Sequence, residues 1–174
     1  MSKTIMITGA GSGLGKGTAL GLAKDGHKVI AGVEIWPQVT ALREEAAKEG
    51  VELAVIKLDI LSEIDRQNAY KYDIDILVNN AGIGETGPIA EIPLQLVRNV
   101  FEVNVFGALE FTQSFARKFV EKGKGKIVFI SSMAGLSTYP FLCAYNASKY
   151  ALEAIAQCMK DELKEFGVQV CTIN

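Results

Sequence analysis

Hydrophobic and polar positions alternate along the chain in two different periods. Short apolar runs rich in β-branched residues predict six strands: Lys3–Thr8, Lys28–Val33, Glu52–Leu58, Ile74–Val78, Lys126–Ile130 and Val168–Ile173. Between these runs, apolar residues recur with helical spacing over Leu14–Asp25, Pro37–Glu49, Leu94–Lys122 and Tyr145–Phe166. Strands that alternate with helices form βαβ units. The pattern therefore predicts an α/β fold, a doubly wound parallel sheet of six strands with helices on both faces, Rossmann-like.

Two stretches depart from a simple alternation. Leu61–Tyr72 is short and polar, so we expect only a stunted helix there. Leu94–Lys122 is long and contains no proline, and it predicts either two helices or one bent helix. We find no linker, low-complexity tract or internal repeat, so residues 1–174 are expected to form a single dinucleotide-binding domain.

Composition and charge exclude several classes of protein. Hydrophobic residues make up 49% of the chain, which suits a sheet covered on both faces. No apolar run is long enough to span a bilayer, the N-terminus lacks the features of a signal peptide, and the net charge of −2 favours neither nucleic acid nor an anionic membrane. Three cysteines without a C-x-x-C pair predict neither a disulfide framework nor a metal site. We expect a cytoplasmic protein.

Residues 8–18, TGAGSGLGKGT, invite two interpretations as a phosphate-binding loop. A nucleoside triphosphate loop needs Ser or Thr directly after its lysine, because that hydroxyl holds Mg²⁺. Here Gly17 follows Lys16, and Thr18 comes one position late. Asp59 could be taken as the acid of a later strand, but the missing metal ligand makes this interpretation the weaker one.

A dinucleotide loop needs a strand, a tight glycine turn and a helix whose N-terminal N–H groups face the pyrophosphate. Gly9, Gly13 and Gly15, spaced as G-x-x-x-G-x-G, lie between a predicted strand and a predicted helix. This spacing alone also allows a glycine-rich helix entry that binds no ligand.

The remaining motifs decide between these alternatives. TGAGSGLG matches TGxxxGxG, residues 79–82 read NNAG, Asn104 lies in EVNVFG, and YNASK occupies 145–149, 13 residues after Ser132 (145−132=13). Over essentially its whole length the chain resembles the classical short-chain dehydrogenase/reductase family. The resemblance implies an oxidoreductase that uses NAD or NADP and transfers hydride between the nicotinamide and a secondary alcohol or ketone.

The resemblance implies four catalytic residues: Asn104, Ser132, Tyr145 and Lys149. Tyr145 and Lys149 are four apart on a predicted helix, so they share a face, and a nearby ammonium favours the phenolate that acid/base catalysis needs. Ser132 ends a strand and can donate to a developing alkoxide. A hydrolase serine would instead need a histidine, and the only one, His27, falls at the opposite end of the strands.

Asn104 is the weakest of the four when judged from its surroundings, because an asparagine inside a helix is often only a tolerated surface residue. In the family this residue relays a proton through water to the lysine, here Lys149. Ser131 is a confusable neighbour of Ser132, and the family spacing selects Ser132.

The cofactor contacts that the resemblance implies form one set: Gly9, Ser12, Gly13, Leu14, Gly15, Glu34, Asp59, Ile60, Asn80, Ala81, Gly82, Tyr145 and Lys149. Asp59 would accept a hydrogen bond from the adenine amino group, although helix N-capping explains it equally well. Glu34 lies 19 residues beyond Gly15 (34−15=19), near the position of the acid that binds the adenine ribose 2′-hydroxyl, one residue after the family's more usual place at Val33. An acid repels a 2′-phosphate, so NAD is expected, with NADP not excluded.

Partners and alternatives complete the expectations. The substrate is a small-molecule alcohol or carbonyl compound, and the two long predicted helices pair in a homodimer or homotetramer in this family. Members of the family continue beyond the position of Asn174 into a substrate-covering region, so the chain is expected to be incomplete at its C-terminus relative to them. A nucleotide-binding module without catalysis and an NADP-preferring ketoreductase remain as alternatives. The intact Ser132, Tyr145 and Lys149 favour an enzyme.

Overall fold

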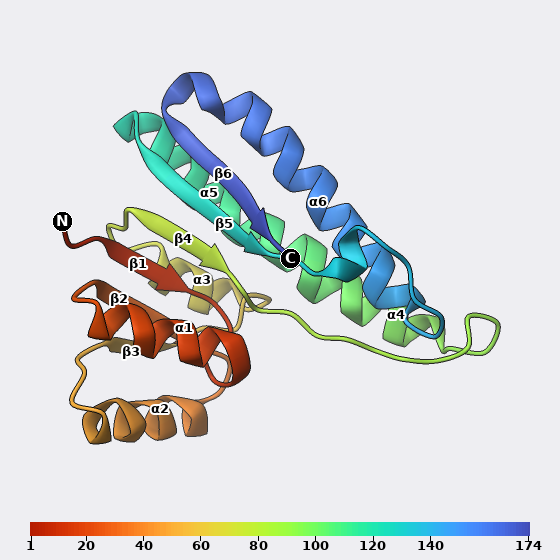
Figure 1. Cartoon of the computed structure of the whole chain (residues 1–174), viewed down its shortest axis with the longest axis horizontal. Coiled ribbons are helices and arrows are strands. Elements are labelled where there is room, and N and C mark those ends of the chain that lie inside the picture. The colour runs from red at the N-terminus through yellow and green to blue at the C-terminus, as the bar shows by residue number, and fades with distance from the viewer. The chain divides into compact units, whose positions relative to one another are not determined.

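The computed structural model describes residues 1–174 as two compact units, Met1–Ala81 and Gly82–Asn174 (Figure 1). In the first unit, the elements in chain order are β1 (Thr4–Ile7), α1 (Gly13–Lys24), β2 (Lys28–Val33), α2 (Trp36–Lys48), β3 (Ala54–Lys57), α3 (Glu63–Ala69) and β4 (Ile76–Asn79). The four strands are parallel, in the order β3-β2-β1-β4. Helices α1 and α2 cover one face of these strands and α3 the other (Figure 1).

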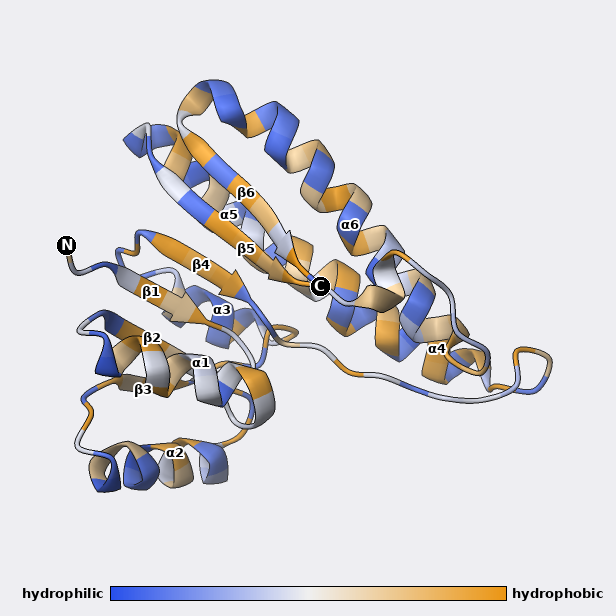
Figure 2. Cartoon of the chain, in the orientation of Figure 1, coloured by the Kyte–Doolittle hydropathy of each residue, from blue (hydrophilic) through white to orange (hydrophobic).

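The strands of the first unit are apolar along almost their whole length (Figure 2). Met6 and Ile7 in β1, Ala31 and Val33 in β2 and Leu77 in β4 have no exposed surface. Helices on both faces remove the alternation of polar and apolar residues that a half-exposed strand shows. This explains why these strands were recognisable as short continuous apolar runs.

The second unit contains α4 (Leu94–Phe101), a π-helical turn (Glu102–Gly107), α5 (Ala108–Lys122), β5 (Gly125–Ile130), a 3₁₀ turn (Met133–Gly135), α6 (Cys143–Leu163), a second 3₁₀ turn (Lys164–Phe166) and β6 (Val168–Ile173). β5 and β6 pair in parallel from Gly125 opposite Val168 to Ile130 opposite Ile173. The buried rings of Phe111, Phe115 and Phe119 on α5 and Phe129 on β5 form the core of this unit.

The predicted elements are all present, and the two irregular stretches have specific structures. Leu61–Tyr72 contains the seven-residue helix α3. Leu94–Lys122 is one helical run that switches to π-helical hydrogen bonding between α4 and α5. None of the helices combines the length and apolar character that a bilayer span requires.

Candidate functional site

The glycine loop of the first unit needs its glycines for two separate reasons. Gly9 and Gly13 have φ values of +65° and +53°, in the left-handed region that side chains disfavour. A Cβ on Gly9 would lie 2.7 Å from the Ala81 Cα, and a Cβ on Gly15 would collide with the Asn80 amide nitrogen and the Gly9 carbonyl oxygen. At Gly9 and Gly15 the loop therefore packs directly against the end of β4, with no room for a side chain at either position.

Thr8 and Asn80 fasten this loop to the end of β4. The Thr8 hydroxyl oxygen accepts the N–H groups of Asn80 and Ala81, each at 3.0 Å. The Asn80 side-chain amide donates to the carbonyl oxygens of Thr8 and Gly9, also at 3.0 Å. Sequence reasoning missed Thr8, although it is the first residue of the motif, TG. In this structure the Asn80 side chain supports the loop.

The N-terminus of α1 is open to an anion. Its N-cap residue, Ser12, has extended backbone and makes no side-chain cap, and the first turn carries no acidic residue. The first N–H groups of the helix are therefore available to a phosphate, and they lie at the positive end of the helix dipole. The glycine loop and this uncapped helix N-terminus together fit the pyrophosphate of a dinucleotide.

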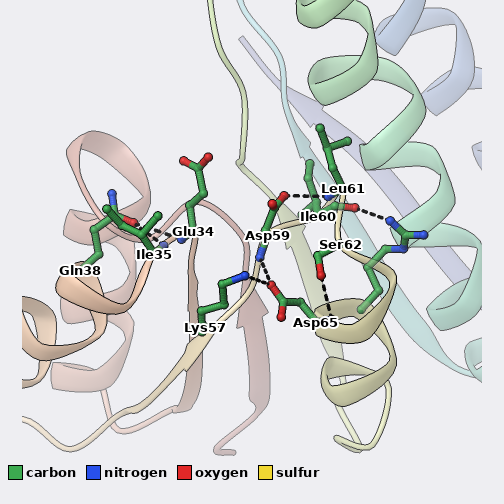
Figure 3. A network of polar contacts seen from close by, with 10 residues as sticks. Glu34, Ile35, Gln38, Lys57, Asp59, Ile60, Leu61, Ser62 and Asp65 are labelled. Carbon is green, nitrogen blue, oxygen red and sulfur yellow. Dashed lines mark hydrogen bonds and ion pairs between the residues drawn. The ribbon is translucent and has the colours of Figure 1, made fainter.

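Glu34 and Asp59 lie at the carboxyl ends of β2 and β3 (Figure 3). The Glu34 carboxylate is exposed, while its backbone N–H donates to the Gln38 side chain. Asp59 accepts the Leu61 N–H at 2.9 Å within its own turn. The N-capping alternative for Asp59 is wrong, because Ser62 is the N-cap of α3 and accepts the Asp65 N–H.

The turn from β3 to α3 is held by a buried acid that sequence reasoning missed. The Asp65 carboxylate accepts the Asp59 N–H at 2.9 Å and forms an ion pair with Lys57 (Figure 3). The hydrogen bond and charge of Asp65 raise the pKa of Lys57 above its ordinary value. Arg66 donates to the carbonyl oxygen of Ile60 at 2.9 Å. These contacts fix the backbone that presents Asp59 and Ile60.

In the second unit, Tyr145 and Lys149 lie one turn apart on α6, as the spacing predicted. Lys149 is 5% exposed; its ammonium nitrogen donates to the carbonyl oxygen of Ile130 at 2.8 Å and lies 5.6 Å from the centre of the Tyr145 ring. Burial lowers the pKa of Lys149 to about 8, and the charge of Glu153 opposes this shift. Lys149 is thus a mainly protonated ammonium at neutral pH, next to a half-buried phenol.

Asn104 is a buried structural link and not a tolerated surface residue. It is 1% exposed in the π-helical turn, a helical distortion often found at functional sites. Its side-chain amide donates to the Ile83 carbonyl at 2.8 Å and the Ser148 hydroxyl at 3.0 Å, and its side-chain oxygen accepts the Ile83 N–H at 2.8 Å. Ser148 donates in turn to the Tyr145 carbonyl at 2.8 Å. Sequence reasoning missed Ser148, although YNASK places it directly before Lys149.

The two adjacent serines after β5 differ in exposure. Ser132 is half-buried, and its hydroxyl oxygen accepts the Ala134 N–H at 3.1 Å, which leaves its own proton free to donate. Ser131 is 7% exposed, and its buried hydroxyl has no partner. Of the two hydroxyl-bearing residues, Ser132 is the more exposed, and its assignment as a catalytic residue stays a prediction.

Phe141, in the loop before α6, carries backbone strain. It is the only non-glycine residue with positive φ, at 66°, and its carbonyl oxygen accepts the Gly87 N–H at 2.9 Å. The ring itself is 65% exposed. A left-handed phenylalanine costs about 1–3 kcal/mol, so its neighbours must hold it in place.

Comparison with known proteins agrees with this geometry. Residues 3–174 match the family model described as short chain dehydrogenase. The chain is 33% identical to a diacetyl reductase [(S)-acetoin forming] of Staphylococcus epidermidis over 98% of its own length and 69% of the relative's. It is 34% identical to an L-2,3-butanediol dehydrogenase of Corynebacterium glutamicum over 96% of its length and 68% of the relative's.

Solved structures extend the likeness to the fold. A short-chain dehydrogenase from Streptomyces avermitilis has a TM-score of 0.90 at 30% identity, over 99% of this chain and 65% of that one. An NAD⁺-bound xylitol dehydrogenase and an actinorhodin polyketide ketoreductase with NADPH each have a TM-score of 0.92 at 28% identity. The alignments cover 99% and 98% of this chain, and 69% of each of those two. The predicted α/β, Rossmann-like fold class is confirmed.

Proposed function

The chain belongs to the short-chain dehydrogenase/reductase family, a family of oxidoreductases, and on that premise we propose that the protein interconverts a secondary alcohol and a ketone. Tyr145 is the acid/base in this proposal, and NAD is the preferred cofactor. The observation that carries it is the buried Lys149 ammonium beside the Tyr145 ring, on the same helix. A nicotinamide cofactor supplies the hydride acceptor or donor when it is bound.

Tyr145 exchanges the proton of the substrate hydroxyl. An ammonium near a phenol stabilises the phenolate charge that forms when the proton leaves. Lys149 is held for this task, because its hydrogen bond to Ile130 and its burial restrict the ammonium to one side of α6. Lys149 also binds the nicotinamide ribose in this proposal, as the family resemblance implies.

Ser132 and Asn104 assist in different ways. The free proton of the Ser132 hydroxyl donates to the substrate oxygen and stabilises negative charge that develops there. The side chain of Asn104 is already used in hydrogen bonds to Ile83 and Ser148. In this proposal Asn104 therefore acts by fixing the backbone at Ile83 and, through Ser148, at Tyr145.

A small substrate is supported by the two named relatives, a diacetyl reductase and a butanediol dehydrogenase. Their names describe compounds in which a hydroxyl or carbonyl group lies next to another. We extend this class, a secondary alcohol or ketone with a neighbouring oxygen, to the present protein.

NAD is preferred because negative charge gathers near the ends of β2 and β3. The carboxylates of Glu34, Asp59 and Asp65 lie there with two cations, Lys57, which pairs with Asp65, and the buried Arg66, which donates to the Ile60 carbonyl, so the negative charges outnumber the positive ones by one. A 2′-phosphate carries between about 1.5 and 2 negative charges at pH 7, by analogy with other phosphate monoesters, and would be repelled. A ribose 2′-hydroxyl would instead donate to an exposed carboxylate such as Glu34.

A homodimer or homotetramer also belongs to this proposal. In the second unit, α5 and α6 border a groove of about 410 Å³ lined by both apolar and charged side chains, among them Val120, Met159, Leu163, Arg117 and Glu121. Pairing of these helices between two copies would cover the apolar residues. Light scattering of the purified protein tests this assignment, and a monomer at micromolar concentration would contradict it.

The enzyme assay follows reduced nicotinamide spectroscopically, with diacetyl, acetoin and 2,3-butanediol as substrates and with NAD and NADP in their oxidised and reduced forms. We expect turnover in both directions, a higher kcat/KM with NAD(H), and no activity without cofactor. Cofactor binding without turnover on any secondary alcohol or ketone would indicate a nucleotide-binding module and overturn the catalytic part of the proposal.

A further inference from the structure

The Gln38 side chain on the first turn of α2 is held in one position by the backbone before it. Its oxygen accepts the N–H of Glu34 at 3.1 Å and the N–H of Ile35 at 3.3 Å (Figure 3). Gln38 is the third residue of α2, and a side chain at that position commonly reaches back to the residue before the helix. Because the oxygen is occupied twice, the orientation of the whole carboxamide is determined.

The same carboxamide lies against the glycine loop. A Cβ on Gly11 would come within 2.6 Å of the Gln38 side-chain carbon and 2.8 Å of its nitrogen. The nitrogen makes no hydrogen bond within the protein, so two N–H donors remain unused. The loop has glycine where the carboxamide approaches it, and the free donors lie between the loop and the end of β2.

An unused acceptor accompanies these unused donors. The Glu34 carboxylate is exposed and has no partner within the protein, and its backbone N–H is one of the two that hold Gln38. A sugar hydroxyl both donates and accepts, so a donor beside an acceptor matches a ribose diol. A phosphate monoester at neutral pH can accept from the donor but has little or no proton to give to the acceptor.

We propose that Gln38 is a cofactor-binding residue, whose amide donates to the 2′ position of the adenine-side ribose while Glu34 accepts from it. This assignment rests on the proposed function. In it, the two residues have different effects: Glu34 discriminates against a 2′-phosphate, whereas the neutral Gln38 donates to a hydroxyl or a phosphate alike. The charge at position 38 therefore sets how far NADP is tolerated.

The test varies the charge at this position and measures the ratio of the two dissociation constants, Kd for NADP over Kd for NAD. Gln38→Glu keeps an acceptor for the two backbone N–H groups but removes the donors and adds a negative charge. Gln38→Lys adds a positive charge. We expect the ratio to rise about tenfold in the first variant and to fall about tenfold in the second, a change of about 1.4 kcal/mol in each direction.

Thr40→Glu and Thr40→Lys are the matched controls, because Thr40 is exposed on the same helix two residues on, and therefore on a different side of it. Their ratios are expected to stay within twofold of the unmutated protein. Trp36, the only tryptophan and 68% exposed at the start of α2, provides a fluorescence signal for the titrations, with calorimetry as a second method.

This design distinguishes a role of Gln38 in capping α2 from a role in cofactor binding. If Gln38 only caps α2 and its side chain does not face the ribose, thermal unfolding changes in the lysine variant, but the ratio of dissociation constants stays within twofold in both variants. That result would overturn the inference and leave the proposed function standing. Failure of the unmutated protein to bind either cofactor would overturn the proposed function and the inference with it.

Discussion

The two units differ in what their candidate chemistry is made of. In Met1–Ala81 it rests on backbone: left-handed glycines, an uncapped helix N-terminus and a loop fastened by Thr8 and Asn80. In Gly82–Asn174 it rests on side chains, with Asn104, Ser148 and Lys149 almost fully buried and hydrogen-bonded.

This difference predicts how each unit responds to mutation. The loop geometry is disrupted when a side chain is added at Gly9 or Gly15, because neither position has space for a Cβ against the end of β4. A buried polar cluster loses its function when one of its functional groups is removed or changes its charge. Added volume should therefore damage the first unit, and deleted atoms or altered charge should damage the second.

Tyr145→Phe removes one oxygen and should have the largest effect on rate. We expect kcat to fall about 10³-fold, or about 4 kcal/mol in the barrier, because the proton-transfer group is lost. The Kd for the cofactor should stay within about twofold, since the ring and Lys149 remain. Tyr150→Phe, an exposed tyrosine on the same helix, is the control and should keep its activity. Turnover of Tyr145→Phe within a few-fold of normal would remove Tyr145 from the mechanism.

Gly15→Ala adds one carbon and tests the first unit. The new Cβ would collide with Asn80 and the Gly9 carbonyl, so we expect a loss of roughly 3 kcal/mol in stability together with loss of cofactor binding. Gly17→Ala, two residues on in α1, meets nothing within 4 Å and should instead stabilise the helix by about 0.5–1 kcal/mol. Urea unfolding and cofactor titration measure both. Equal behaviour of the two variants would show that the loop is not tightly packed.

Lys149→Met removes a buried charge and should raise stability while it abolishes activity. The pKa of Lys149 is lowered to about 8 in the folded protein, below its ordinary 10.5, so the unfolded chain binds more protons between these values. The wild type should therefore become more stable relative to the variant as pH rises from 8 towards 10.5. Below pH 8, the gap between the unfolding free energies of the two proteins should be constant. The 2.5-unit difference (10.5−8=2.5) sets an upper limit of about 3 kcal/mol for that gap.

Urea unfolding at several pH values measures this gap, with Lys160→Met as the control. Lys160 is exposed on the same helix, so its removal should leave the unfolding free energy within about 0.5 kcal/mol of the wild type. A wild type that is as stable as Lys149→Met at pH 7 would show that burial of the ammonium is compensated by its hydrogen bond to Ile130.

Glu34→Arg should have the smallest effect, because the residue is exposed. We expect NADP to bind several-fold more tightly and NAD several-fold more weakly, about 1 kcal/mol each after screening by salt. Titrations with both cofactors measure it, and Glu44→Arg, exposed on α2, is the control. Equal affinity of the unmutated protein for the two cofactors would indicate that Glu34 is turned away from the ribose.

Local patterns along the sequence were sufficient to predict the architecture and to identify the motif residues. Apolar runs marked all six strands, and helical spacing marked the long helices, because strands covered on both faces and helices packed on one face leave periodic traces in a single segment. Ser132, Tyr145 and Lys149 could be named as candidate catalytic residues because their spacing along the chain matches the family motif.

Contacts between distant segments were beyond the reach of such patterns. No spacing revealed that Asn104 would bond to Ile83 and Ser148, that Asp65 would hold the turn at Asp59, or that the Gln38 amide would lie against Gly11. Burial and hydrogen bonding depend on which side chains the folded chain brings together, and these were also what lowered the pKa of Lys149. The sequence by itself determined which groups are available for the chemistry. Only the tertiary structure decided which of them are desolvated, oriented and left with an unused donor or acceptor, because these properties belong to the surroundings of a residue and not to its identity.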